Sequence, residues 1–480
     1  MTKRSPQELF VLLVPAIAMF AIIVFGERVT IDGDPFWHIA AGGWMLDHGQ
    51  VIREDVLSYT MAGKPWQAHE WLSEIIMAGT YRLSGLHGLF ILLGLTYAAT
   101  SLLIGRSLLR SLDPVPALIV LGFALACLKS WMMMRPHSFA LPILAAWADE
   151  LLLARSEHRT PRSVILVPLM LAWINLHPSF LFGLALLALF AVESVVEDRR
   201  SFTLLLPPIL ASGAAAFVNP SGIGGVLFPL LFATGGAAGL IPEWQSSTFG
   251  SISPLEISLL VGMLVAFSLG VRVPFMRLIL LAAILHLTLA HQRFVIVLAT
   301  LGSMLLAEPI AKALRARGWV SSGDQAVING RPIFAGAALI AFALAAASFL
   351  IPRGIQNENI TPVAALSSIP AEIVQQPVFN DWRIGGYMVL QGYKVFIDGR
   401  AELYGAEWFR NYLAISEGDY EALSTTLHEY AVVWTILQQR NGANQLLRLM
   451  PDWCLHYADS AAVVFIRNDA LERANRTCPG

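Results

Sequence analysis

Long apolar stretches recur along the first 351 residues, and they constrain the fold more than any other feature of the chain. A helix of roughly 20 apolar residues is long enough to cross the hydrocarbon core of a bilayer. About eleven stretches qualify: 9–26, 86–105, 115–131, 138–154, 163–177, 179–196, 202–218, 255–270, 274–290, 294–311 and 332–351. Since 56% of the residues are hydrophobic and 14% are charged, the sequence predicts a polytopic α-helical membrane protein with about eleven transmembrane helices.

The first apolar stretch follows Lys3 and Arg4, as in a signal sequence. No small-residue cleavage site follows it, and its length suits a membrane anchor, so we expect it to be retained.

The net charge is −2 and no block of Lys or Arg is present, which excludes nucleic acid as a partner.

The positively charged residues predict the orientation in the membrane. They concentrate in alternate connections, at Arg106, Arg110, Arg155, Arg159, Arg162, Arg199, Arg200, Arg272, Arg277, Lys312, Arg315, Arg317 and Arg331. Because cytoplasmic loops carry excess Lys and Arg, these connections and the N-terminus are predicted to be cytoplasmic. An odd number of spans then places the C-terminal region outside, in the periplasm or at the cell exterior. The apolar segment 223–236 is short and rich in glycine, and we interpret it as interfacial or re-entrant within an outer loop, 219–254.

With this orientation the polar clusters of the chain share the outer face. They are 32–74, 129–137, 175–179, 243–247 and 286–293. Polar residues near the membrane are costly, so their concentration on one face predicts a functional site there.

The chain divides into a membrane domain, 1–352, with a first outer loop, 27–85, and a polar tail, 353–480. The tail is predicted to be a soluble α/β domain outside the cytoplasm, with strands in QPVFND, YKVFIDG, AVVWTIL and AAVVFIR and helices in GDYEALSTTLHEY and GANQLLRLM. A parallel inner sheet is expected. Cys454 and Cys478 lie in the tail and could pair if the compartment is oxidising, whereas Cys127 is expected to be buried filler.

The stretch IDGDPFWHIAAGGWMLDHG opens the first outer loop. Asp34-Pro35 predicts a helix start with Asp34 as its cap. The apolar residues that follow at helical spacing predict an amphipathic helix in the headgroup layer, with its tryptophans as anchors. His38 lies one turn on and could sit beside the carboxylate of Asp34. Asp32 is unexplained by capping.

The rest of this loop adds Asp55, His69, Glu70 and Glu74. A structural interpretation makes Asp55 a helix cap and the two glutamates a polar stripe on a surface helix. A functional interpretation is that crowded carboxylates near a low-dielectric surface raise one another's pKa, as a general base or a divalent metal site requires. Asp32 and Asp34 could bind Mg²⁺ or Mn²⁺ only if Gly33 turns the chain, so we rank a base above a metal.

Several motifs together resemble a known group of enzymes. The motifs are DGDPFWHIAAGGWMLDHG, DVLSYTMAGKPWQAHEWLSE, RPHSFALP, NLHPSFLFG, IPEW and VFNDWRIGGYMVLQGYKVFIDGRAELYG. They resemble the multi-span C-type glycosyltransferases, the GT-C superfamily, which includes oligosaccharyltransferases, protein O-mannosyltransferases and the lipid A aminoarabinose transferase. Within that superfamily the chain is most similar to a bacterial group with this architecture, and the resemblance covers most of the chain.

The resemblance implies a membrane glycosyltransferase that moves a sugar from a polyprenyl phosphate to a glycan, lipid or protein acceptor. The acidic residue of the first outer loop that deprotonates the acceptor would be Asp34, with Asp32 second and His38 tuning it. The chain departs from protein O-mannosyltransferases, which have adjacent acidic residues here. The departing phosphate would be stabilised by Arg135, His137 or Arg293. 

Further residues are predicted to contact substrates. His177 could line the acceptor entry and Glu243 could close over the site. Asp398 and Arg400 are expected at the end of a strand, where open α/β sheets often bind ligands; the alternative is a turn closed by a salt bridge of Arg400. Asp55, His69 and Glu70 are also predicted to bind substrate. The tail is predicted to position the acceptor glycan.

Two other functions fit the same composition. A flippase or transporter of lipid-linked saccharides would have ionisable residues near mid-membrane, whereas here they gather in outer loops. A non-catalytic protein of envelope polysaccharide assembly would have an acidic loop that is merely solvated.

Overall fold

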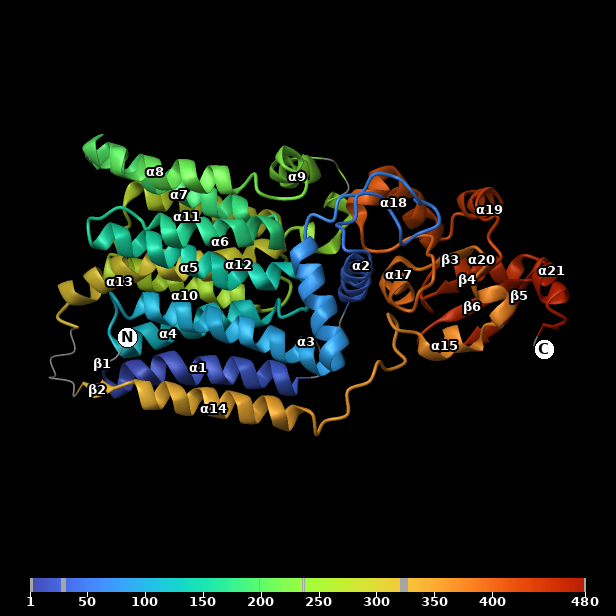
Figure 1. Cartoon of the computed structure of the whole chain (residues 1–480), viewed down its shortest axis with the longest axis horizontal. Helices are drawn as coiled ribbons and strands as arrows, with labels where there is room; N and C mark the ends of the chain where they lie inside the picture. Colours follow the sequence, from blue (N-terminus) through green and yellow to red (C-terminus); the bar gives the residue numbers. More distant parts are fainter. Residues whose placement is uncertain are drawn as a thin grey trace. The chain divides into compact units, whose positions relative to one another are not determined.

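A computed structural model describes residues 3–26, 32–197, 199–234, 236, 238–319 and 327–478. Its contacts divide the chain into two compact units (Figure 1). The first comprises Met1–Val29, His87–Pro229 and Pro242–Pro352. The second comprises Thr30–Leu86, Leu230–Ile241 and Arg353–Gly480, so the first outer loop and the polar tail fold together.

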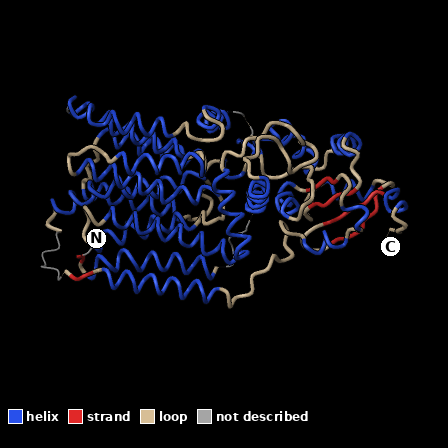
Figure 2. The backbone as a smooth tube through the Cα atoms, viewed as in Figure 1, coloured by secondary structure: helices blue, strands red, loops and turns tan. Residues whose placement is uncertain are grey.

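The first unit is a bundle of apolar helices (Figure 2). Its helices are α1 (Pro6–Phe25), α4 (Pro114–Lys129), α5 (Pro136–Ser156), α6 (Ser163–Leu176), α7 (Phe180–Glu197), α8 (Arg199–Ala215), α10 (Pro254–Leu269), α11 (Phe275–Ala290), α12 (Val295–Val297), α13 (Ser303–Ala316) and α14 (Arg331–Ser348). The boundary between the units falls within α9 (Ile223–Thr234), after Pro229. Helix α3 (Trp71–Leu108) is bent at Gly85, where φ is 58°, and its part after residue 86 belongs to this bundle. Short strands β1 (Lys3–Arg4) and β2 (Ile328–Asn329) pair antiparallel.

Each apolar stretch expected to span the membrane coincides with a helix, so the helical prediction is confirmed. Among the described residues, five helical segments are long and apolar enough to cross a membrane: Pro6–Phe25, Trp71–Leu108, Pro136–Ser156, Gln292–Ala316 and Arg331–Ser348. The other apolar helices have 10–17 residues. The total of eleven spans stays a prediction.

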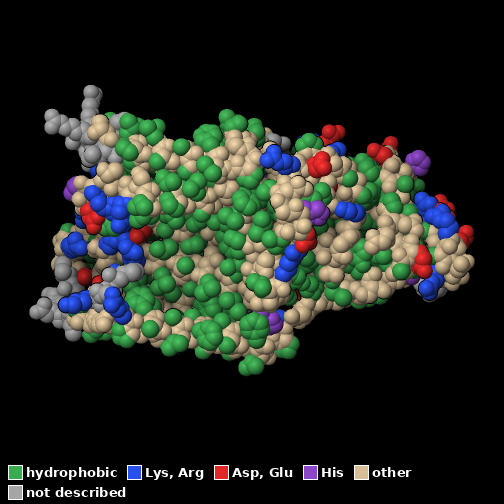
Figure 3. Space-filling view, in the orientation of Figure 1, with side chains coloured by type: hydrophobic (Ala, Val, Ile, Leu, Met, Phe, Trp, Pro, Cys, Tyr) green, Lys and Arg blue, Asp and Glu red, His purple; other side chains and the backbone are tan. Residues whose placement is uncertain are grey.

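Basic side chains gather at the end of the bundle that carries the N-terminus, and the rest of its visible face is mainly hydrophobic (Figure 3). Arg110 Nη2 lies 2.5 Å from Asp149 Oδ2. Arg315 donates to the carbonyl oxygen of Ser111 at 2.8 Å. Connections that the charge pattern assigned to one side of the membrane therefore lie together.

The polar tail contains a four-stranded mixed sheet. Its strands are β3 (Val378–Asn380), β4 (Trp434–Leu437), β5 (Trp453–Ala458) and β6 (Val463–Arg467), in the order β3-β4-β6-β5. Only β3 and β4 are parallel, so the expected parallel inner sheet is wrong. The helices are α15 (Val363–Ser368), α16 (Ala371–Val374), α17 (Trp382–Leu390), α18 (Ala401–Glu417), α19 (Tyr420–Glu429), α20 (Ala443–Leu449) and α21 (Asn468–Arg473). Those predicted at α19 and α20 are present.

The strand predicted in YKVFIDG does not form; Val395 makes only an isolated bridge with Ser58. The side chain of Asn380 takes the place of a neighbouring strand, because its Oδ1 accepts from the Phe396 amide at 2.8 Å and its Nδ2 donates to the Ile397 carbonyl at 2.7 Å. The first outer loop supplies another partner, since Thr60 Oγ1 donates to the Phe396 carbonyl at 2.7 Å. These bonds satisfy backbone groups that a sheet would otherwise pair.

Helix α2 (Asp34–His48) belongs to the core of the second unit. The ring of Phe36 meets that of Tyr387 edge-on, with centroids 5.6 Å apart, and Trp37 is only 5% exposed. The expected helix start is confirmed, but the expected tryptophan anchor in the headgroup layer is wrong for Trp37. Its ring is buried because α2 packs directly on α17, where a Cβ at Gly386 would overlap the carbonyl oxygen of Gly33.

Cys454 and Cys478 form a disulfide in this unit. Cys127 is buried and free in the bundle, as expected.

Candidate active site

The two aspartates of the DGD motif stand at the start of α2, each with a different local role. Gly33 is the N-terminal cap residue, in the right-handed helical region, and Asp34 is the first helical residue. The Asp34 backbone N–H donates to Asp32 Oδ1 at 2.9 Å. The expectation that Asp34 caps the helix is therefore wrong, because Asp34 lies inside the helix and the cap position is occupied by Gly33.

The carboxylate of Asp34 is half-buried and held in place. Trp37 Nε1 donates to Asp34 Oδ1 at 3.2 Å. Gly399 lies directly against this group: a Cβ there would overlap Asp34 Oδ1 and come within 3.0 Å of Trp37 Nε1. Position 399 must lack a side chain for the Asp34 carboxylate to occupy this place.

His38 lies beneath Trp37, with the ring centroids 3.5 Å apart. Its Nδ1 is 3.2 Å from Glu74 Oε1, and its Nε2 is 3.8 Å from Glu70 Oε2. Glu74 is 1% exposed, so the expected polar stripe on a surface helix is wrong for this residue. Asp34 and the glutamates are thus linked through Trp37 and His38.

His69, another predicted site residue, lies close to Glu70. His69 Nε2 is 3.9 Å from Glu70 Oε2. The imidazoles of His69 and His38 therefore approach the same carboxylate.

Asp55 organises a turn in the first outer loop. Its carboxylate accepts from the backbone N–H groups of Leu57 and Ser58 at 3.1 and 3.0 Å, and from Arg400 Nη1 at 2.6 Å. No helix starts here, so the expected helix cap is wrong. Burial raises the pKa of Asp55, but the charge of Arg400 and a hydrogen bond from Ser58 outweigh burial and hold the pKa below its usual value.

Arg400 is fully buried. Its Nε and Nη2 donate to the two carboxylate oxygens of Asp398, at 2.9 and 2.6 Å. Its guanidinium carbon lies 4.6 Å from the ring centroid of Trp66, and Trp66 Nε1 donates to Glu402 at 2.9 Å. The salt-bridge alternative for Asp398 and Arg400 is therefore confirmed. Because neither side chain is exposed, we assign both to holding the loop on the tail rather than to contacting substrate.

A second polar cluster lies in the helix bundle. Glu243 forms an ion pair with Arg135, and its Oε1 is 3.0 Å from Arg293 Nη1. The guanidinium of Arg293 lies over Trp244, 4.7 Å from the ring centroid. Burial raises the pKa of Glu243, but the charges of Arg135 and Arg293 outweigh burial and lower it to about 2. The three charged groups carry a net charge of +1.

Two histidines extend this bundle cluster. The rings of His137 and His177 meet edge-on, with centroids 6.2 Å apart. His137 Nε2 is buried and has no hydrogen-bond partner among the described residues. The Ser179 backbone N–H donates to His177 Nδ1 at 3.1 Å, so a neutral His177 carries its proton on Nε2.

The predicted site residues thus fall into two groups. Those of the second unit are Asp32, Asp34, His38, Asp55, His69, Glu70, Asp398 and Arg400; those of the bundle are Arg135, His137, His177, Glu243 and Arg293. The sequence interpretation missed Trp37, Trp66 and Gly399, although the glycine in DGR was a visible signal for close approach.

The described residues contain no group of three or more His, Cys, Asp or Glu side chains arranged to hold a metal ion. Asp32 and Asp34 supply two carboxylates. Mg²⁺ commonly binds through one or two carboxylates together with water and substrate phosphate oxygens. Metal dependence stays a prediction.

No protein-family model matches the chain, and no curated protein sequence matches it. The fold is similar to a crystal structure of the oligosaccharyltransferase of Archaeoglobus fulgidus in the apo form, with a TM-score of 0.54, 12% identity and coverage of 89% of this chain and 69% of that one. The same enzyme tethered to an acceptor peptide with the NVT sequon gives a TM-score of 0.53, 12% identity and coverage of 89% and 68%.

A third similar structure is ArnT of Cupriavidus metallidurans bound to undecaprenyl phosphate. Its TM-score is 0.49 at 15% identity, with coverage of 95% of this chain and 97% of that one. The conclusion rests on the two oligosaccharyltransferase structures, and at such low sequence identity it concerns the fold alone. The chain shares the fold of this oligosaccharyltransferase.

Proposed function

We propose that the protein transfers a sugar from a polyprenyl-phosphate donor to a glycan, lipid or protein acceptor of the cell envelope, on the periplasmic side of the inner membrane. The observation that carries this proposal is the fold shared with an oligosaccharyltransferase over 89% of the chain. A sugar held on a membrane lipid has to be met at the membrane surface, and apolar helices combined with polar outer loops suit that requirement.

Asp34 is the proposed general base. It removes the proton of an acceptor hydroxyl while that oxygen attacks C1 of the donor sugar. The bond between C1 and the phosphate oxygen breaks, and polyprenyl phosphate leaves as the anion. Trp37 is the proposed positioning residue, because its indole N–H fixes one oxygen of the Asp34 carboxylate.

Arg135, Arg293 and His137 are proposed to stabilise the leaving phosphate. The cluster of Arg135, Glu243 and Arg293 keeps one positive charge in excess, and guanidinium groups present planar donors that match phosphate oxygens. His137 Nε2, which is buried without a partner among the described residues, offers one more group.

A divalent cation at Asp32 and Asp34 is the competing assignment for these carboxylates. Such an ion would polarise phosphate oxygens and neutralise their charge. Treatment with EDTA separates the assignments: a base retains turnover in the chelator, whereas a metal site loses it and regains it with Mg²⁺ or Mn²⁺.

The test is turnover of Asp34→Asn, followed as transfer of labelled sugar from a polyprenyl phosphate to a membrane acceptor. Asn keeps an oxygen that can accept from Trp37, so the fold should persist while basicity is lost. We expect turnover to fall about 10²- to 10⁴-fold, the usual contribution of a positioned base.

Asp452→Asn is the matched control, because Asp452 is an exposed aspartate of the same unit. It should leave turnover unchanged. Wild-type turnover in Asp34→Asn would remove Asp34 from the role of base.

A further inference from the structure

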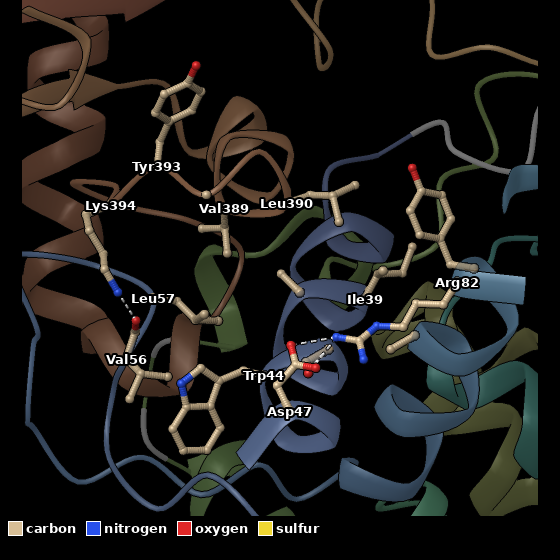
Figure 4. Close-up of a pocket in the computed structure, with 15 residues that line it drawn as sticks. Ile39, Trp44, Asp47, Val56, Leu57, Arg82, Val389, Leu390, Tyr393 and Lys394 are labelled. Carbon is tan, nitrogen blue, oxygen red and sulfur yellow. Dashed lines mark hydrogen bonds and ion pairs between the residues drawn. The ribbon is translucent and has the colours of Figure 1, made fainter. Parts of the chain in front are cut away.

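A cavity of about 400 Å³ opens on the second unit (Figure 4). It is lined by helix α2, the first part of α3, the loop at residues 56–57, and the end of α17 with the turn that follows. Its size is within the range of small-molecule sites. None of the proposed catalytic or phosphate-binding residues lines it.

The lining combines aromatic rings with charged groups. Trp44, Tyr81 and Tyr393 supply rings, and Asp47, Arg82 and Lys394 supply charges. In Figure 4, Trp44 lies between the Asp47–Arg82 pair and Lys394, whereas the Tyr393 hydroxyl is directed away from that pair. A ring flanked by hydrogen-bonding groups suits a ligand with an apolar face and a polar rim.

Trp44 is held in position before any ligand binds. Its ring stacks on that of His48, with centroids 4.0 Å apart and planes 12° from parallel. His48 Nδ1 is 2.8 Å from the Trp44 carbonyl oxygen. An aromatic platform fixed in this way loses little conformational entropy when it is covered.

Arg82 is also held in position, yet some of its N–H donors remain available to a ligand. Its Nη2 donates to Asp47 Oδ2 at 2.7 Å and to the Gly43 carbonyl at 3.0 Å. Its Nε and Nη1 make no hydrogen bond with another described residue. Asp47, with 58% of its side chain exposed, is available as an acceptor, so donors and an acceptor stand side by side, as adjacent sugar hydroxyls require.

Lys394 gives the cavity an excess positive charge. Its ammonium donates to the Val56 carbonyl, and it forms no ion pair with the part of the chain that the structure describes. Asp47 neutralises Arg82, so Lys394 remains as a charge for an anionic group of the ligand.

We propose that this cavity binds one carboxylate-bearing sugar unit of the acceptor, with its apolar face on Trp44, its hydroxyls on Asp47 and Arg82, and its carboxylate on Lys394. A pyranose ring has an apolar C–H face and a rim of hydroxyls, and a uronic acid adds one carboxylate. The inference rests on the proposed function, because it names the acceptor class for that transferase.

The experiment compares methyl β-glucuronide with methyl β-glucoside, two probes that differ in the carboxylate. Binding to the full-length protein is followed by saturation-transfer NMR in lauryldimethylamine oxide, a detergent without a sugar headgroup. We expect the wild type to bind the glucuronide about five-fold more tightly than the glucoside. Lys394→Gln should abolish the preference, and Lys64→Gln, which alters an exposed lysine outside the cavity, should retain it.

Two further variants test the contribution of the aromatic ring and that of the Arg82 donors separately. Trp44→Ala should weaken binding of both probes about ten-fold or more, and Arg82→Gln should weaken both while leaving the aromatic platform intact. Equal binding of the two probes by the wild type, or an unchanged preference in Lys394→Gln, would overturn the proposal. Lys394-dependent binding of glycerol 1-phosphate without binding of the glucuronide would assign the cavity to a lipid headgroup and also overturn it.

Asp34→Asn distinguishes this proposal from the proposed function. It should bind the glucuronide like the wild type while transfer is lost. Intact transfer without glucuronide binding contradicts only the cavity assignment, and glucuronide binding without any transfer by the wild type contradicts only the transferase.

Discussion

Arg400 forms ion pairs with two buried carboxylates, one near it in the sequence and one far from it. Asp398 lies two residues away, whereas Asp55 lies in the first outer loop, and both are within 2.6 Å of guanidinium nitrogens. Removing one partner from a buried ion pair leaves an uncompensated charge, which typically destabilises a protein by about 3–5 kcal/mol. The loop and the tail are therefore expected to unfold together when this residue is replaced.

The corresponding prediction is that Arg400→Gln unfolds the second unit at a markedly lower temperature, measured by intrinsic fluorescence in detergent. Arg410→Gln is the matched control, since Arg410 is exposed on α18. It should shift the midpoint little, as surface substitutions usually do. Equal midpoints for the two variants would show that the buried network contributes nothing.

At the scale of elements, glycines determine how α2 packs. Gly33 and Gly386 meet so closely that a Cβ on either would overlap a backbone carbonyl. Gly42 brings α2 against the carbonyl of Glu74 in the same manner. Helix α2 thus packs on α17 and on the first part of α3 through backbone contacts, and both contacts fix the orientation of Asp34.

Gly386→Ala is predicted to destabilise the second unit by about 1–3 kcal/mol, because α2 must move to admit a methyl group. Gly79→Ala in α3 is the control: nothing lies within 4 Å of a Cβ there, and alanine favours a helix over glycine by about 0.5–1 kcal/mol. Thermal unfolding of the two variants measures the difference. A lower midpoint for Gly79→Ala than for Gly386→Ala would contradict this packing.

These elements show what the sequence could predict and what it could not. The start of α2 followed from Asp34-Pro35, because cap and proline preferences are local. The burial of Trp37 did not follow, since Gly386 and Gly399, which lie against it, are some 350 residues away in the sequence. Hydrophobic spacing also does not distinguish a headgroup layer from a protein core. The strand expected in YKVFIDG failed for a similar reason: Asn380 and the first outer loop supply its hydrogen bonds.

For the whole molecule, composition and charge were the more reliable guides. The apolar stretches predicted the helices of the bundle, and the alternation of Lys and Arg predicted which connections lie together at one end. The association of the first outer loop with the tail was not predicted, because it depends on the pairing of Asp55 with Arg400 and on glycine contacts between segments far apart in sequence.

The central claim, that the protein acts on a polyprenyl-phosphate-linked sugar, is tested most directly by native mass spectrometry of the detergent-purified protein. Asp34→Asn should retain the donor, because the variant binds the lipid but cannot complete transfer. We predict a co-purified polyprenyl phosphate carrying one sugar on Asp34→Asn, at higher occupancy than on the wild type. Ordinary phospholipids alone, on variant and wild type alike, would contradict the account.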